Sequence, residues 1–318
     1  MALLEVTNLK QHFTIKKGFM GAKTVVKAVD GVSLIIEEGQ TLGIVGESGC
    51  GKSSLGRSIL RLAEPTEGSI KFKGEEVIGK NPKQMKELRK EMQIVFQDPY
   101  ASLNPRNTVR QILEAPLDIH HIGTRKERRE KIEQLVEKIG LRKDQLNNYP
   151  HEFSGGQRQR IGIARALALN PRLIIADEPV SALDVSVQSQ VLNLMLELQQ
   201  EMNLSYMFIS HDLSVVQHIS DKVAVMYLGK VVEISDVEKV YSDPKHPYTR
   251  ALLSALPVPD PLQKKERIIL QGDLPSPSNP PSGCPFHTRC PIATKECAEI
   301  VPPLEEKTPG HFAACIHT

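Results

Sequence analysis

Residues 46–53 read GESGCGKS and fit the pattern G-x-x-x-x-G-K-[ST]. Glycines let a backbone curl so that successive N–H groups face an anion, and Lys52 would reach the outer phosphates of a nucleotide. The hydroxyl of Ser53 would bind the accompanying Mg²⁺. An accidental glycine turn is the alternative, and a chain of this length should contain such a match roughly one time in a hundred. The segment therefore predicts a phosphate-binding loop.

Two acidic residues end an apolar run elsewhere in the chain. Residues 173–176 read LIIA, and Asp177 and Glu178 follow directly. Such a run is typical of a buried parallel strand, which delivers side chains to its C-terminal edge. Asp177 would hold Mg²⁺ through water, and Glu178 would be the general base on the attacking water. Two acids can also be an ordinary polar strand end, but the phosphate loop favours the catalytic interpretation.

Three further polar features are weak signals when each is taken alone. Gln97 follows an expected short strand, and its amide oxygen would reach a metal-bound water. His211 ends another expected strand at the nucleotide's sheet edge, where it would contact the γ-phosphate, although a lone histidine is more often structural. Residues 154–157 read SGGQ and open a helix, which makes them either an anion site or a plain helix cap.

Periodicity predicts the elements that would position these side chains. The expected strands are 4–6, 32–36, 41–45, 69–72, 94–96, 173–176, 204–210, 223–228 and 231–234, and the expected helices are 53–62, 83–91, several within 107–160, one ending near 169, and 185–202. Thr124 and Glu127 form a capping box ahead of an apolar stripe. Phe13 precedes the loop and is either a platform for adenine or an ordinary strand residue.

Composition limits the function classes. The 318 residues carry a net charge of +2, no Trp and 4% aromatic residues, which argues against bulk attraction to nucleic acid and against a base-stacking surface. No apolar run approaches the roughly 18–20 residues that cross a bilayer, and the N-terminus does not resemble a secretory signal. We therefore expect a cytosolic chain with reduced thiols, whose five cysteines are not a disulfide framework.

In order along the chain, the phosphate loop, Gln97, the SGGQ segment, the Asp177–Glu178 pair and His211 together resemble an ATP-binding cassette (ABC) ATPase over roughly residues 3–243. The resemblance implies an α/β P-loop NTPase fold with a mixed sheet core, an antiparallel β-subdomain and a helical subdomain at about 98–165. It also implies a head-to-tail dimer that sandwiches ATP and Mg²⁺ between the phosphate loop of one subunit and the SGGQ signature of the other. Phe13 stands where the family often has Tyr, and Phe153 where Leu is usual.

The resemblance assigns site residues by position. The implied catalytic residues are Glu178, His211 and Gln97, and the implied Mg²⁺ ligands are Ser53, Gln97 and Asp177. Nucleotide contacts are implied for Phe13, Gly46, Ser48, Gly49, Cys50, Gly51, Lys52, Ser53, Ser54, Ser154, Gly155, Gly156, Gln157 and Asp184.

The tail refines the resemblance. Residues 246–255, HPYTRALLSA, look like the extension of ATPases from oligopeptide and dipeptide importers, a group that includes nickel importers. We expect an ATPase domain at 1–243 and an extension at 244–318. The implied partners are a second ATPase subunit, in a heterodimer or a homodimer, two transmembrane permease subunits and an extracytoplasmic substrate-binding protein, at the cytoplasmic face of the membrane. Nickel import, and a soluble ATPase acting on nucleic acid or ribosomes, are the alternatives.

The last 35 residues hold four cysteines, Cys284, Cys290, Cys297 and Cys315, with spacing C-x5-C-x6-C-x17-C. Four thiols in a reduced compartment suggest metal ligation, and wide spacing without C-x2-C pairs favours a structural [4Fe–4S] cluster over Zn²⁺. A module without metal and a redox sensor remain open, and His287, His311 and His317 could replace a cysteine ligand. The predicted module spans about 282–318, after proline-rich segments 257–261 and 275–281 that suggest a stiff connection.

Overall fold

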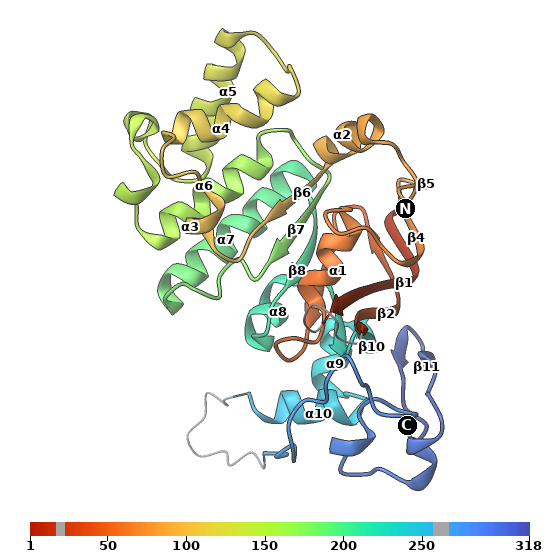
Figure 1. Ribbon diagram of the computed structural model, residues 1–318. Helices are drawn as coiled ribbons and strands as arrows, with labels where there is room; N and C mark the ends of the chain where they lie inside the picture. The colour runs from red at the N-terminus through yellow and green to blue at the C-terminus, as the bar shows by residue number, and fades with distance from the viewer. Residues whose placement is uncertain (17–22, 257–266) are drawn as a thin grey trace. The chain divides into compact units, whose positions relative to one another are not determined.

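The structure, a computed structural model, describes residues 1–16, 23–256 and 267–318 (Figure 1). Its residues fall into two units. The first contains Met1–Glu37, Thr41–Gly79 and Ser210–Thr318, and the second contains Glu38–Gln40 and Lys80–Ile209. The proline-rich segment 257–261, which we expected to be a stiff connection, lies outside the described residues.

The first unit contains an antiparallel sheet of order β2-β1-β4-β5. Alternate residues of β2 are buried from Val32 to Ile36, as expected for a strand with one face on the core. The two long strands are interrupted by register shifts near Val6, Leu9 and Gln11. The antiparallel subdomain that the family resemblance implied is therefore present.

The first unit also contains strands around the phosphate loop. β3 pairs in parallel with β9, β9 and β10 form an antiparallel hairpin, and β12 extends that hairpin on the far edge of β10, with β11 beyond it. The first unit's elements are β1 (Ala2–Lys16), β2 (Lys23–Glu37), β3 (Thr41–Val45), α1 (Lys52–Ile59), β4 (Glu67–Phe72), β5 (Glu75–Glu76), α8 (Leu213–Ile219), β9 (Lys222–Tyr227), β10 (Lys230–Asp236), α9 (Val237–Ser242), α10 (Pro247–Ser254), the 3₁₀ turns η3 (His287–Arg289) and η4 (Lys295–Ala298), β11 (Glu305–Thr308) and β12 (His311–Ala313).

The second unit combines a parallel sheet with helices. β6 and β8 flank β7 in parallel, and all five residues of β7 and of β8 are buried. Its elements are α2 (Pro82–Glu91), β6 (Met92–Val95), α3 (Pro99–Ser102), α4 (Val109–Ile119), α5 (Arg125–Lys138), the 3₁₀ turns η1 (Lys143–Asn147) and η2 (Pro150–Glu152), α6 (Gly155–Leu167), β7 (Leu173–Asp177), α7 (Val185–Met202) and β8 (Ser205–Ile209).

Most expected elements are present, but the strands predicted at 4–6 and 32–36 are much longer, at Ala2–Lys16 and Lys23–Glu37. β3 and α7 match the predicted ranges, and Thr124 caps α5 through the predicted capping box with Glu127. Helix α1 ends at Ile59 rather than at residue 62, because Arg61 adopts a positive φ of 48° that a helix cannot continue through. Strands β11 and β12 of the tail had no sequence prediction.

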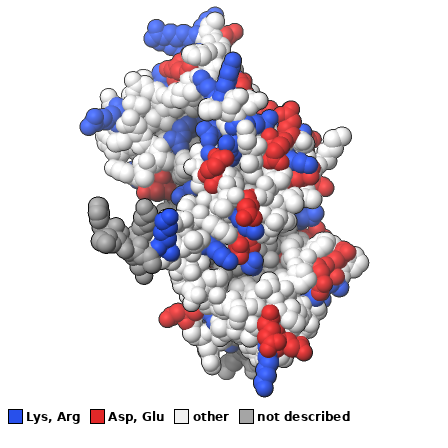
Figure 2. All heavy atoms as spheres, turned by 45° about the vertical axis from the view of Figure 1, so that its right-hand side comes forward, with Lys and Arg blue, Asp and Glu red and all other residues white. Residues whose placement is uncertain are grey.

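Charged side chains of both signs are interspersed on the face drawn in Figure 2. This mixture agrees with the near-neutral net charge of +2. Among the described residues, no helix is long and apolar enough to cross a membrane.

Candidate nucleotide-binding and catalytic site

The phosphate loop joins β3 to α1, as its sequence predicts. At Gly51, the N-cap of α1, φ is +105°, and an added Cβ would lie 1.9 Å from the carbonyl oxygen of Ala28, so only glycine fits. Gly51 provides no side chain to cap α1, and backbone N–H groups in the first turn of a helix can bind an anion.

Lys52 is directed back onto its own loop. Its side chain is buried, and Nζ donates to the carbonyl oxygens of Gly46 at 2.8 Å and Glu47 at 3.1 Å. The ammonium group is therefore held at the loop, where a phosphate group would offer it stronger, charged acceptors. Cys50 is also buried, and burial raises the pKa of its thiol.

The catalytic candidates of the second unit meet one another. Gln97 follows β6 and Glu178 follows β7, and because these strands are parallel neighbours their ends lie side by side. The Gln97 Nε2 donates to Oε2 of Glu178 at 2.9 Å. Asp177, the last residue of β7, is only 3% exposed. The two strand ends thus present a pair of carboxylates and an amide together.

Glu178 has an unusual backbone conformation for a non-glycine residue. Its φ is +48°, and its N–H is held by the carbonyl oxygen of Ile209 at 2.9 Å. A residue in the left-handed region costs conformational energy, and such residues cluster at functional sites. The half-buried Glu178 is therefore a stronger catalytic candidate than the sequence alone could indicate.

The start of α6 confirms the predicted serine cap. Oγ of Ser154 accepts the N–H of Gln157, and the Gln157 side chain accepts the N–H of Ser154. Gly156 lies against α7, where an added Cβ would come within 2.2 Å of Val187 Cγ1. This capping box uses two backbone N–H groups, and those of Gly155 and Gly156 lie in the same first turn.

The remaining predicted contacts are placed as follows. Phe13 lies on β1 opposite Val26 and is 39% exposed, and His211 lies two residues after the end of β8. Ser48 and Gly49 are exposed at the tip of the loop, Ser53 and Ser54 are half-buried in the first turn of α1, and Asp184 is the exposed N-cap of α7.

The cysteines of the tail line one cavity. Cys284, Cys290, Cys297 and Cys315 surround a space of about 10 Å³, together with His287 and His317. Burial, reinforced by the neighbouring cysteines, raises the pKa of Cys284 to about 11, and burial also raises the pKa of Cys290. All five cysteines are free thiols.

Metal ligation by this cavity is not supported by the side-chain positions. Among the described residues, no group of three His, Cys, Asp or Glu side chains is placed to hold a metal ion. The thiols converge on one space, but a cavity of about 10 Å³ accommodates roughly one water molecule. The predicted histidine substitutes also separate, because His311 pairs with Glu233 at 2.6 Å whereas His317 contacts Sγ of Cys297 at 3.3 Å.

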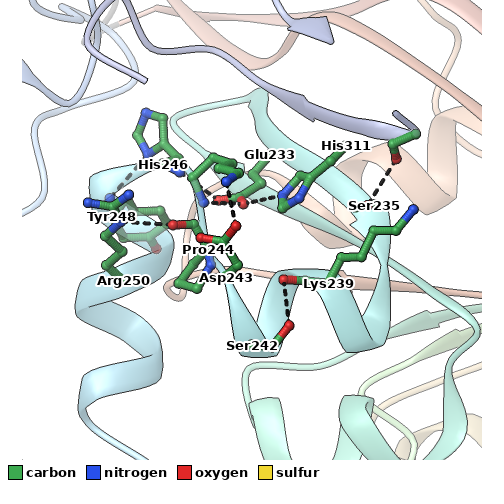
Figure 3. A network of polar contacts seen from close by, with 12 residues as sticks. Glu233, Ser235, Lys239, Ser242, Asp243, Pro244, His246, Tyr248, Arg250 and His311 are labelled. Atoms are coloured by element: carbon green, nitrogen blue, oxygen red, sulfur yellow. Dashed lines mark hydrogen bonds and ion pairs between the residues drawn. The ribbon is translucent and has the colours of Figure 1, made fainter. Parts of the chain in front are cut away.

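The extension is anchored by a buried carboxylate (Figure 3). Glu233, on β10, is fully buried and accepts from Nε2 of His311 and from the backbone N–H groups of Lys245 and His246, at 2.6, 2.7 and 2.9 Å. His246 caps α10 by accepting the N–H of Tyr248 at 3.1 Å. Sequence reasoning missed this network because its members are scattered along the chain.

Comparison with known proteins shows the family to which the chain belongs. The ABC transporter family model matches residues 29–181, and the model of the oligopeptide/dipeptide transporter C-terminal region matches residues 232–297. The structure matches that of a dimeric ATP-binding cassette in a post-hydrolysis state bound to ADP and Pi. The match covers 74% of this chain and 98% of that one, with a TM-score of 0.65 and 30% identity. The chain matches cbiO1 of Clostridium perfringens, part of the ABC transporter complex cbiONQ, with a TM-score of 0.65 and 26% identity over 76% of this chain and 91% of that one. The chain belongs to the ABC transporter family, as an ATPase.

Full-length relatives place it more finely. It is 58% identical to the oligopeptide transport ATP-binding protein AppF of Bacillus subtilis, over 98% of this chain and 96% of that protein. It is 55% identical to the dipeptide transport ATP-binding protein DppF of Haemophilus influenzae, over 99% and 96%. The chain is thus a member of the ABC transporter branch that carries the oligopeptide/dipeptide C-terminal region.

Proposed function

We propose that this chain is the ATP-hydrolysing subunit that powers import of dipeptides or oligopeptides across the cytoplasmic membrane. One observation carries the proposal. The same chain contains a phosphate loop, a hydrogen-bonded pair of Gln97 and Glu178, and after them the oligopeptide/dipeptide C-terminal region. The similar proteins are named for oligopeptide and dipeptide transport, which favours peptides over nickel and over a soluble role on nucleic acid or ribosomes.

In this proposal each site residue has a role in ATP hydrolysis. Lys52 neutralises the β- and γ-phosphates and Phe13 stacks on adenine, while Ser53, Gln97 and Asp177 hold Mg²⁺, directly or through water. Glu178 accepts a proton from the attacking water and His211 contacts the γ-phosphate. Residues Ser154, Gly155, Gly156, Gln157 and Asp184 complete the ATP site of the opposite subunit.

The proposed partners are a second ATPase subunit, two permease subunits and a binding protein. We favour a heterodimer with a similar second ATPase, with a homodimer as the alternative. ATP binding closes the dimer, hydrolysis releases it, and two permease subunits at the cytoplasmic face convert that motion into transport. An extracytoplasmic binding protein delivers the peptide. The relevant support is the dimeric cassette among the similar structures.

Transport itself can be tested in vesicles that contain the permease subunits, the partner ATPase and the binding protein. We expect ATP-dependent accumulation of a labelled dipeptide or oligopeptide, abolished by Lys52→Ala because the loop loses its phosphate-binding cation. ATP hydrolysis by the wild-type chain with Ni²⁺ accumulation, and no peptide accumulation, would contradict peptide import while leaving the ATPase assignment intact.

We also propose that Cys284, Cys290, Cys297 and Cys315 hold a structural [4Fe–4S] cluster, with Zn²⁺ as the alternative. The support is the convergence of four thiols on one cavity. Burial raises the pKa of these thiols, and a bound cation would lower it again, because a thiol that ligates a metal loses its proton. The thiols would have to move apart to admit a cluster, given a space of about 10 Å³.

Metal analysis of anaerobically purified protein tests the cysteine proposal. About four irons and four sulfides per chain, lost in Cys297→Ser, are expected for the cluster. One zinc without sulfide would replace it with a zinc module. Neither metal in the wild-type protein would contradict both forms of the proposal.

A further inference from the structure

Glu47, in the phosphate loop, is held by two side chains of the extension. Its backbone N–H donates to Oη of Tyr248 at 2.9 Å, and its two carboxylate oxygens accept from Nη1 of Arg289 at 3.1 and 3.0 Å. Its carbonyl oxygen accepts from Lys52 at 3.1 Å. Each backbone polar group and the carboxylate of Glu47 therefore has a partner, and two of the three lie more than 200 positions away.

Both extension residues are firmly seated. The Arg289 side chain is 9% exposed, and its guanidinium lies 6.0 Å over the ring of Tyr227. Tyr227, Tyr248 and Phe286 are fully buried and pack on one another at centroid distances of 4.7 to 5.4 Å. Because packed aromatic rings and a charge-assisted hydrogen bond restrict rotamers, the donors reach Glu47 from a rigid base.

The other end of the loop is held without the extension. The carbonyl oxygen of Cys50 accepts the N–H of Gly229 at 2.8 Å, in the turn between β9 and β10, and Gly51 is packed against the Ala28 carbonyl. The cassette therefore holds the second half of the loop by itself, whereas in the first half Tyr248 and Arg289 add to the contacts that Lys52 makes with Gly46 and Glu47.

The negative charge of Glu47 makes its partners in the extension important for nucleotide binding. A carboxylate beside an anion-binding loop repels a triphosphate, and the repulsion is strong where water is partly excluded. Glu47 is 27% exposed, and Arg289 both cancels its charge and sets its direction. Removing the guanidinium would leave an unpaired carboxylate in the loop, which is more costly than removing both charges.

We propose that Arg289 and Tyr248 are positioning residues for nucleotide binding, which act through Glu47 by ordering the first half of the phosphate loop and neutralising its one acid. The inference rests on the proposed role of the loop in binding ATP. If so, the affinity for nucleotide depends on residues of the extension as well as on those of the cassette, although the extension lies outside the ATP-binding motifs.

Nucleotide affinity of the full chain tests the proposal, measured by calorimetry with Mg²⁺ and a non-hydrolysable ATP analogue under anaerobic conditions. We expect Arg289→Ala to raise Kd roughly tenfold. The double variant Glu47→Gln/Arg289→Ala should recover to within about threefold of wild type, because no unpaired carboxylate remains. Arg250→Ala is the matched control: it removes another arginine of the extension, whose Nε donates to the Pro244 carbonyl and not to the loop.

Each result separates the inference from the proposed function. A folded Arg289→Ala with a Kd within about twofold of wild type would overturn the inference, as would a double variant no better than the single one. If Arg289→Ala does not fold, Tyr248→Phe removes only the hydroxyl on Glu47; we expect its Kd to rise roughly threefold, and an unchanged Kd would overturn the proposal. Wild-type protein that binds no nucleotide would instead refute the proposed function.

Discussion

The phosphate loop and the C-terminal extension are stabilised in different ways. The loop combines a short-range contact, from Lys52 to a carbonyl only six positions away, with long-range contacts from Tyr248 and Arg289 to Glu47. The extension depends on buried side chains, with Glu233 and His311 paired across 78 positions. We infer that substitutions of motif side chains change chemistry with little effect on folding, whereas substitutions in the buried network around Glu233 change stability first.

The sharpest test of this contrast is Glu178→Gln, for which we expect the largest effect. Loss of a general base should lower kcat by about 10²–10⁴-fold, while the Kd for MgATP changes by less than about threefold and the thermal midpoint stays the same. Turnover by the purified ATPase and calorimetric binding measure the two quantities. Glu197→Gln, at an exposed acid of α7, should leave both unchanged. Wild-type turnover in Glu178→Gln would remove Glu178 as the base.

The reverse case is Glu233→Gln, at the carboxylate of β10 that anchors the extension. A neutral amide cannot satisfy His311 and two backbone N–H groups equally well, so we expect a loss of about 2–4 kcal/mol in the free energy of unfolding. Urea unfolding of the full chain measures it. Glu299→Gln, at an exposed acid of the same tail, should change the free energy of unfolding by less than about 0.5 kcal/mol. A similarly small loss at Glu233 would contradict the contrast.

A pH series can sharpen the same contrast at His246. Burial lowers the pKa of His246 to about 3, from an ordinary value of 6.5. The imidazole of His246 therefore binds a proton more readily in the unfolded chain than in the folded one. The contribution of neutral His246 to the free energy of unfolding is complete above pH 6.5 and is lost as pH falls toward 3, at up to about 1.4 kcal/mol per pH unit. His246→Asn keeps a cap acceptor for α10 but cannot titrate.

The measurement is the thermal midpoint of wild type and His246→Asn between pH 7 and pH 4. We expect the variant's midpoint to fall less steeply with acid than that of wild type, because one titrating group is gone. Parallel curves would mean that His246 does not couple folding to protons.

The smallest expected effect is that of Ser154→Ala, where a motif residue also stabilises a helix. Loss of the cap on α6 should cost about 1 kcal/mol of stability. Amide hydrogen exchange in the first turn of α6 would report it, with Ser189→Ala on α7 as a control that removes a hydroxyl but no cap. No change in exchange would show that the capping box is energetically unimportant here.

The sequence predicted those features whose causes are local. The apolar run of β7, the helix of α7 and the cap at Ser154 each follow from neighbouring residues, and all three occur where predicted. The order of the motifs likewise predicted the family. Metal ligation by the four cysteines stays a proposal, because spacing alone does not fix how thiols are oriented around a cavity.

By itself, then, the sequence determined the ABC family, the phosphate loop and the strand ends that carry the candidate catalytic acids, because each depends on contacts within a few residues. Only the tertiary structure decided that Glu178 takes a positive φ, that Glu233 anchors the tail, and that Arg289 and Tyr248 hold Glu47. These contacts join segments as much as 242 positions apart, and their partners are set by how strands and helices pack. No periodicity or spacing along the chain records such a pairing.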